Sequence, residues 1–268
     1  MIFADTATQR RFARHLERVL VLDPQPASAK LLVELLKDLG ARNIRVESTA
    51  GKALAVARSE DPQIIFTELA GANLDGLAFT KALRRSEFAC RQAPIIMTTS
   101  EATAAAITGA RDAGVHEFLR KPFNIKDLVR RIEAVASRPR DWVEAVEYIG
   151  PDRRRFNSGD YKGARKRKSD AAATSNAARI EQALRIVKAA LLATERDPQQ
   201  AHRALAAQAS DLTKLAVIVG DTKLATCAAA LATALKAATV VGRLDRGPLE
   251  AVCAPLWAYL PAADVQAA

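Results

Sequence analysis

The chain has 268 residues, 49% of them apolar and 5% aromatic, which suits one large domain or two ordinary ones with alanine-rich helical cores. Its formal net charge of +10 favours acidic partners, such as nucleic acid, a nucleotide, an anionic membrane or an acidic protein face. No window approaches 18 apolar residues, so we expect neither secretion nor a membrane span. Three unclustered cysteines indicate a reducing, cytoplasmic setting without a metal site: Cys90, Cys227 and Cys253.

Residues 1–17 predict a short helical extension, and residues 18–138 predict one α/β domain. Short apolar runs alternate there with amphipathic segments, which is the pattern of consecutive strand–helix units. The expected strands are 19–22, 44–46, 64–66, 95–97 and 117–119, and the expected helices are 27–39, 51–59, 77–85, 102–113 and 125–135. Such short, apolar strands predict a doubly wound, five-stranded parallel sheet with sites at the carboxyl ends of its strands.

The composition changes after Val146, where a basic segment begins. The stretch 151–170 holds eight basic residues against three acids, so we interpret 139–175 as a flexible linker. Alternatively, its side chains grip the phosphates of nucleic acid or a cyclic dinucleotide beside Phe156 and Tyr161. The residues that would do so are Arg153, Arg154, Arg155, Arg165, Lys166, Arg167 and Lys168.

The last third of the chain predicts a small four-helix bundle over residues 176–262, followed by a disordered tail at 263–268. Asp197 and Asp221 suit helix N-caps, and Gly220 and Gly242 suit helix ends. The expected helices are 176–193, 198–219, 221–239 and 248–260.

Charged or polar residues follow four of the predicted strands. They are Asp23, Glu68, Thr99 and Lys121, and Phe118 lies within the fifth strand. Together with VLVLD, IIFTEL…LDG, PIIMTTS and FLRKPF, in that order, they resemble the receiver domain of bacterial two-component response regulators. The resemblance covers about 120 residues and implies a CheY-like, flavodoxin-like fold.

The resemblance also assigns roles to these positions. In that family an aspartate at the place of Glu68 accepts a phosphoryl group, and an acidic pair after the first strand holds magnesium. Thr99 and Lys121 match the residues that turn toward the phosphate and pair with it, and Phe118 matches an aromatic switch position. Two positions depart from the family, because Glu68 replaces the phosphoacceptor and Pro24 replaces the second acid beside Asp23.

These departures weaken the chemistry. Magnesium needs nearly octahedral oxygen ligands, so we expect at most weak Mg²⁺ binding at Asp23 and Glu68, and no other cofactor. The extra methylene of Glu68 moves the nucleophilic oxygen by about 1 Å, and such a shift costs about a hundredfold in an aligned displacement. Three alternatives remain: Glu68 mimics the phosphorylated state, pairs with Lys121 in an inert pocket, or retains residual phosphorylation.

The second and third helical patterns resemble a histidine phosphotransfer domain that lacks its histidine. In that family the histidine stands some ten residues before a glycine turn, and here that place falls at about Ser210. The histidines of the chain stand elsewhere, at His15, His116 and His202. We therefore expect a bundle that carries no phosphate and that binds a partner, forms a homodimer, or only packs against its own receiver.

These features favour a cytoplasmic, non-enzymatic signalling adaptor. The resemblance implies a sensor histidine kinase, a phosphotransferase or another regulator as the partner, meeting a face that includes Phe118, Pro122 and Phe123. The rivals are an ordinary phospho-switched response regulator and a binder of nucleic acid or cyclic dinucleotide through the linker. The sequence has no Gly-rich phosphate loop, nucleophile elbow or metal cluster that would support an independent enzyme.

Overall fold

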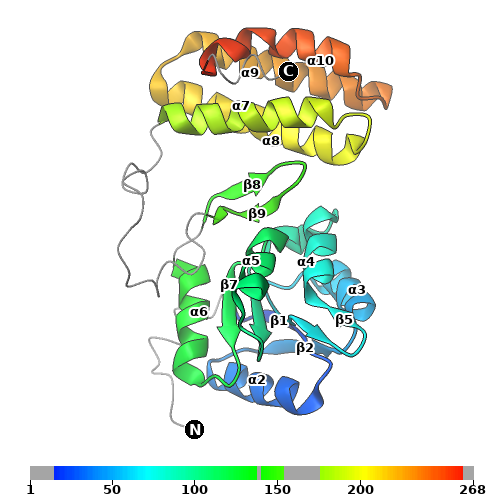
Figure 1. The fold of residues 1–268 in the computed structure, drawn as a ribbon, viewed down its shortest axis with the longest axis vertical. Helices are drawn as coiled ribbons and strands as arrows, with labels where there is room; N and C mark the ends of the chain where they lie inside the picture. The colour runs from blue at the N-terminus through cyan, green and yellow to red at the C-terminus, as the bar shows by residue number, and fades with distance from the viewer. Residues whose placement is uncertain (1–14, 138–139, 154–175, 262–268) are drawn as a thin grey trace. The chain divides into compact units, whose positions relative to one another are not determined.

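The computed structural model describes residues 15–137, 140–153 and 176–261 (Figure 1). Within these residues the chain divides into two compact units. The first contains residues up to 143 together with 148–153, and the second contains 144–147 together with 176–261. The predicted helical extension, most of the basic linker and the predicted tail lie outside the described residues.

The first unit is built on a five-stranded parallel sheet in the order β2-β1-β3-β6-β7. This confirms the predicted doubly wound fold, and each strand lies within a few residues of its predicted position. All residues of the central strands β3 and β6 are buried, because helices cover both faces of the sheet. The strands are β1 (Arg18–Leu22), β2 (Asn43–Glu47), β3 (Ile64–Glu68), β6 (Ile95–Thr99) and β7 (Glu117–Arg120).

Alternating side chains divide the core into two layers. Val19 and Val21 of β1 pack in the cluster that includes α2 and α6, whereas Leu20 and Leu22 pack in the cluster that includes α3, α4 and α5. The helices are α2 (Pro26–Asp38), α3 (Ala50–Glu60), α4 (Gly76–Arg85), α5 (Ala104–Ala113) and α6 (Ile125–Ser137), with a 3₁₀ turn, η1 (Ala89–Gln92).

A two-stranded ribbon, β4 (Ala70–Gly71) and β5 (Leu74–Asp75), joins β3 to α4. The side chain of Asp75 caps α4 by accepting a hydrogen bond from the Ala78 amide at 2.9 Å. A Cβ on Gly76 would lie 2.1 Å from the carbonyl oxygen of Glu68, so only glycine lets the chain pass this closely behind the end of β3.

A hairpin, β8 (Trp142–Glu144) and β9 (Ile149–Pro151), lies inside the range 139–175 that we predicted as linker. That part of the prediction is wrong for residues 142–151. In the first unit, the guanidinium of Arg84 lies over the Trp142 ring at 5.2 Å, and a Cβ on Gly114 would meet the Ile149 carbonyl at 2.4 Å. The basic composition that follows Val146 concealed the aromatic and apolar residues that anchor this hairpin.

The second unit contains four helices that pack together, which confirms the predicted bundle. Asp197 and Asp221 are N-caps, accepting hydrogen bonds from Gln200 N at 3.2 Å and Leu224 N at 2.9 Å. Gly220, with a φ of 69°, ends α8. The helices are α7 (Asn176–Leu192), α8 (Pro198–Val219), α9 (Thr222–Val241) and α10 (Arg246–Cys253).

The fourth predicted helix is shorter than expected. α10 ends at Cys253 and continues as a 3₁₀ segment, η4 (Ala254–Tyr259). Pro255 stands in the first turn of η4, and its missing amide cannot continue the α-helical ladder.

The length and composition of α9 are sufficient to cross a membrane, contrary to our expectation that no segment would be. This observation is weak, because core helices of soluble proteins meet the same criteria. One face of α9 packs in the core of the helical unit through Leu224, Ala228, Leu231 and Leu235.

Candidate functional site

The fold brings the four predicted pocket residues to one end of the sheet. Asp23 follows β1, Glu68 ends β3, Thr99 ends β6 and Lys121 follows β7. Parallel strands end at the same edge, so residues far apart in the chain become neighbours. Asp23, Glu68 and Thr99 are all buried.

Lys121 connects the two acids. Its Nζ lies 2.8 Å from Asp23 Oδ2 and forms a second ion pair with Glu68 Oε2. The side chains of Lys121, Asp23 and Glu68 are 18%, 3% and 11% exposed, so water screens these pairs poorly. Burial lowers the pKa of Lys121, but the two carboxylates more than offset this effect and leave that pKa above its ordinary value.

The remaining carboxylate oxygens also have partners. Glu68 Oε1 accepts a hydrogen bond from the Leu69 amide at 3.0 Å, and Asp23 Oδ1 accepts one from the Gln25 amide at 2.8 Å. Each acid therefore has one oxygen on Lys121 and the other on a backbone amide. All four carboxylate oxygens of the pocket are therefore used in contacts within the first unit.

Pro24 closes the side of the pocket where the family has its second acid. A Cβ on Gly71 would lie 2.5 Å from Pro24 Cγ, so the proline ring packs directly against the loop after β3. Among the described residues, no three His, Cys, Asp or Glu side chains form a group suited to a metal ion. Lys121 occupies one oxygen of Asp23 and one of Glu68.

An open hollow of about 550 Å³ borders the pocket between α2 and the end of β2. Asp23 and Pro24 form part of its wall, and its charged side chains are Lys30, Glu47 and Lys52. The pocket therefore adjoins an accessible surface.

The switch residues are placed differently from one another. Thr99 Oγ1 accepts a hydrogen bond from the Glu101 amide at 3.1 Å and, within the described part of the chain, makes none to Glu68. Phe118 is 3% exposed and lies in the core, so it is not on an accessible face. Pro122 is exposed and Phe123 is partly buried, so only these two of the three predicted interaction-face residues are reachable.

Of the seven basic residues predicted to bind anions in the linker, only Arg153 lies within the described residues. Its Nη1 forms an ion pair with Asp112 at 3.0 Å, and its guanidinium lies 4.4 Å from the centre of the Tyr148 ring. Arg153 is thus held within the first unit. The anion-binding interpretation of the other six residues stays a prediction.

A buried arginine network is the main feature that the sequence did not reveal. Arg84 is 1% exposed, and its guanidinium makes five hydrogen bonds at 2.5–3.2 Å, to the carbonyls of Arg91, Ala93 and Gly114 and to His116 Nδ1. Burial lowers the pKa of Arg84 to about 9. Burial, together with the charges of Arg84 and Arg140, holds the pKa of His116 well below its usual value. The only sequence signal was a basic residue on the inner face of an amphipathic helix.

No histidine stands at the phosphocarrier position of the helical unit. Ser210 is exposed on α8 at the place where the family resemblance would put one. His202 instead lies near the start of α8, with its Nε2 3.0 Å from Thr239 Oγ1 on α9.

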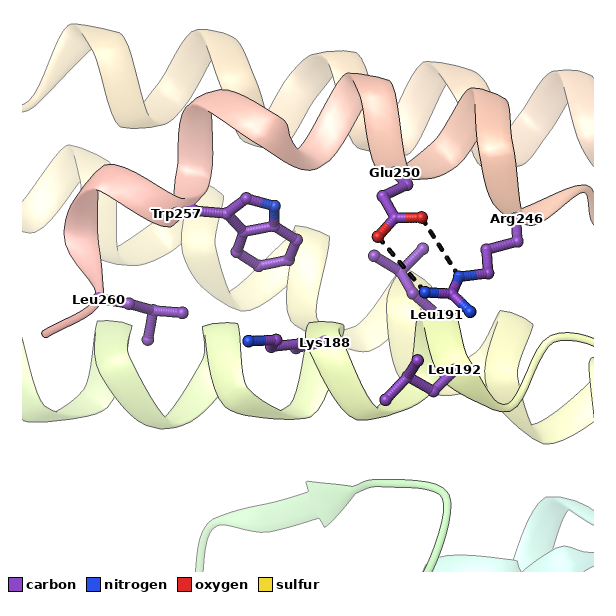
Figure 2. Close-up of a pocket in the computed structure, with 7 residues that line it drawn as sticks. All are labelled: Lys188, Leu191, Leu192, Arg246, Glu250, Trp257 and Leu260. Carbon is purple, nitrogen blue, oxygen red and sulfur yellow. Dashed lines mark hydrogen bonds and ion pairs between the residues drawn. The ribbon is translucent and has the colours of Figure 1, made fainter. Parts of the chain in front are cut away.

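The helical unit also has a small pocket between α7 and the α10–η4 segment (Figure 2). Leu191 and Trp257 line it, and Arg246 pairs with Glu250 at one end with a shortest N–O distance of 3.2 Å. Its volume is about 90 Å³, well below the roughly 300 Å³ at which small-molecule sites begin.

Comparison with known proteins agrees with the geometry of the first unit. Residues 19–133 match the family described as the response regulator receiver domain. PilH of Pseudomonas aeruginosa is 27% identical over 118 residues, which cover 44% of this chain and 96% of that protein. The chemotaxis protein CheY of the same species is 27% identical over 121 residues, covering 45% of this chain and 97% of that protein.

Two further matches have a similar extent. The DNA-binding response regulator MtrA of Mycolicibacterium smegmatis is 27% identical over 134 residues, covering 50% of this chain and 57% of that protein. The solved structure of Vibrio cholerae CheY4 is 24% identical, with a TM-score of 0.42, over 45% of this chain and 98% of that one. The family match identifies residues 19–133 as a response regulator receiver domain of the CheY-like kind.

Proposed function

We propose that this protein is a non-enzymatic, cytoplasmic adaptor whose pseudo-receiver acts by binding another protein of a two-component pathway. The observation that carries the proposal is the position of Lys121 between Asp23 and Glu68. The family resemblance implies that this lysine pairs with a phosphoryl group. Here Asp23 and Glu68 already pair with the lysine. We call the pocket closed in this sense, because Lys121 has its anionic partners without phosphate.

The chemistry of the pocket opposes phosphotransfer. An attacking Glu68 would have to give up Lys121 or the Leu69 amide, and its carboxylate is about 1 Å further along the side chain than an aspartate would be. Pro24 offers no side-chain oxygen to the magnesium ion that would align the phosphoryl group. Both effects reduce the rate of the reaction.

A fixed, inert pocket is better supported than mimicry of the phosphorylated state. In the described part of the chain, Thr99 Oγ1 accepts its hydrogen bond from the Glu101 amide and makes none to Glu68. A carboxylate also carries one charge, whereas a phosphoryl group carries nearly two. Complete switching requires about 5.5 kcal/mol of differential stabilisation. An ion pair of this kind contributes less than that.

The partner that fits best is a sensor histidine kinase, a phosphotransferase or another regulator. Pro122 and Phe123 follow Lys121 directly, so the closed pocket positions the turn that would contact this partner. Co-purification from the native cell is expected to recover a protein of one of these classes. Recovery of none of them would contradict the adaptor role.

Phosphorylation with acetyl phosphate and magnesium, followed by intact-mass measurement, tests the closed pocket. We expect no phosphoryl adduct on the parent chain, little or none on Glu68→Asp, and a clear adduct on Pro24→Asp/Glu68→Asp, which restores both acids. Pro24→Asp/Glu68→Asn is the matched control, because it restores the metal ligand without a nucleophile. A stoichiometric adduct on the parent chain would overturn the proposal.

A further inference from the structure

The five-stranded sheet of the first unit has two edges, which differ in how they are covered. At the β7 edge, Glu117, Phe118 and Leu119 are all buried. At the β2 edge no residue of the strand is buried, and Val46 is 45% exposed. β2 pairs with β1 in one unbroken register and contains neither proline nor lysine. Because such residues and bulges are what usually keep an open edge from pairing, β2 is able to accept a further strand.

The main-chain groups on the open side of β2 belong to Ile44 and Val46. The Asn43 amide donates to the Glu17 carbonyl at 3.1 Å, so the main-chain groups of Asn43 face β1. These groups alternate in direction along a strand, and those of Ile44 and Val46 therefore face away from β1. In the described part of the chain they form no hydrogen bond on that side.

The side chains of β2 carry opposite charges on one face of the sheet. Arg45 and Glu47 pair in register with β1 residues that pack in the α3 layer, so both point to that face. Arg45 Nε donates to both carboxylate oxygens of Glu60, at 2.7 and 2.8 Å. Within the residues that the structure describes, its two Nη groups make no hydrogen bond. β2 thus presents a cation with unused donors two residues from an anion.

This arrangement is complementary to itself. In antiparallel pairing of β2 with the β2 of a second copy about a two-fold axis at Val46, the two Val46 residues exchange their main-chain hydrogen bonds. Arg45 of each copy then lies opposite Glu47 of the other, which gives two pairs of opposite charge. Moving the axis by one residue would place the two Arg45 side chains opposite each other, so the charges select the register centred on Val46.

We propose that the β2 edge is an interface between two copies of this chain, which pair antiparallel about Val46 and join their sheets into one. Val46 also forms part of the wall of the hollow beside α2, together with Pro26 and Val33, and the second Val46 would cover part of this apolar surface. A two-fold axis uses both open edges, so association stops at the dimer. The inference does not rest on the state of the receiver pocket or on the adaptor function.

The dimer should be weak, because a pair of five-residue strands covers less than the roughly 1,200 Å² of a standard interface. We expect a dissociation constant of about 10–100 μM for the full-length chain, measured by sedimentation equilibrium at concentrations up to about 500 μM.

A charge exchange tests the register. Arg45→Glu and Glu47→Arg should each weaken the dimer at least about tenfold, because each opposes like charges at both pairs. An equimolar mixture of the two variants should form a heterodimer about as strong as the parent dimer, since every pair is then opposite in charge. Arg58→Glu makes the same change of charge at an exposed residue of α3 and should dimerise like the parent.

Val46→Pro tests the pairing without a change of charge. It removes an amide that faces away from β1, so the sheet should remain intact while the dimer is lost. In the parent chain, hydrogen exchange at the Val46 amide should slow as the concentration rises. A parent chain that stays monomeric, a dimer that survives Val46→Pro, or failure of the two charge variants to associate with each other would overturn the proposal.

Discussion

The receiver holds two cations at opposite ends of its sheet, and they are stabilised by different means. Lys121, at the carboxyl end, lies between two carboxylates, which raise its pKa. Arg84, near the amino ends of β6 and β7, is bound by neutral carbonyls and His116, and burial lowers its pKa to about 9. At Lys121, opposite charges are paired. At Arg84, hydrogen bonds to main-chain carbonyls and a contact with the Trp142 ring hold two loops and the β8–β9 hairpin in place.

The difference separates a modified functional pocket from a structural one. At the carboxyl end of the sheet, Lys121 pairs with both Asp23 and Glu68. In the described part of the chain, the five hydrogen bonds of the Arg84 guanidinium go to main-chain carbonyls and His116 and none goes to an acid, so this cation acts as a rigid set of donors. Substitutions at Arg84, Lys121 and His116 test this distinction.

Arg84→Met should lower the free energy of unfolding by about 3–5 kcal/mol, because three buried carbonyls lose their donors at once. Urea unfolding at pH 7 measures this loss. Lys81→Met, on the exposed face of the same helix, should change the free energy by less than about 0.5 kcal/mol. Equal effects of the two substitutions would show that the Arg84 hydrogen bonds do not hold the fold.

Lys121→Met should lower the free energy of unfolding by less, about 1–3 kcal/mol. The Lys121 side chain is partly accessible, so water can reach Asp23 and Glu68 when the ammonium group is removed. In the Lys121→Met/Glu68→Gln double variant, part of this loss should be recovered, since one buried charge is removed with its partner. A double-mutant cycle in urea measures the coupling. Additive effects would mean that Lys121 and Glu68 are not coupled.

The stability of the receiver should fall as the pH drops below about 6.5. His116 has a lowered pKa in the folded state, so the unfolded chain takes up its proton first and is favoured in acid. This group alone contributes a slope of up to about 1.4 kcal/mol per pH unit between its unfolded and folded pKa values. Unfolding curves from pH 7 to pH 5 for the parent and His116→Gln should diverge, and parallel curves would contradict the assignment.

Much of the fold could be predicted because strand and helix periodicities are local. The same is true of the caps at Asp197 and Asp221 and of the alignment of Asp23, Glu68, Thr99 and Lys121 at strand ends. The Arg84 network could not be predicted, because its acceptors are main-chain carbonyls that no residue type specifies. The contacts of Gln200 and Gln208 with Glu144 and Ala145 were missed for a related reason. The basic stretch 151–170 separates the two sides of these contacts in the chain and conceals their relation.

NMR titration of the Lys121 ammonium group measures directly whether Asp23 and Glu68 hold this lysine in the charged form. We expect a Lys121 pKa above the ordinary value of 10.5 in the parent chain, no change in this pKa on addition of magnesium, and a lower Lys121 pKa in Glu68→Gln. Since the folded pKa is raised, the stabilisation is fully present at neutral pH and is lost only as the pH rises through it. A Lys121 pKa at or below 10.5, or one that falls when magnesium enters the pocket, would contradict the claim that the receiver is closed.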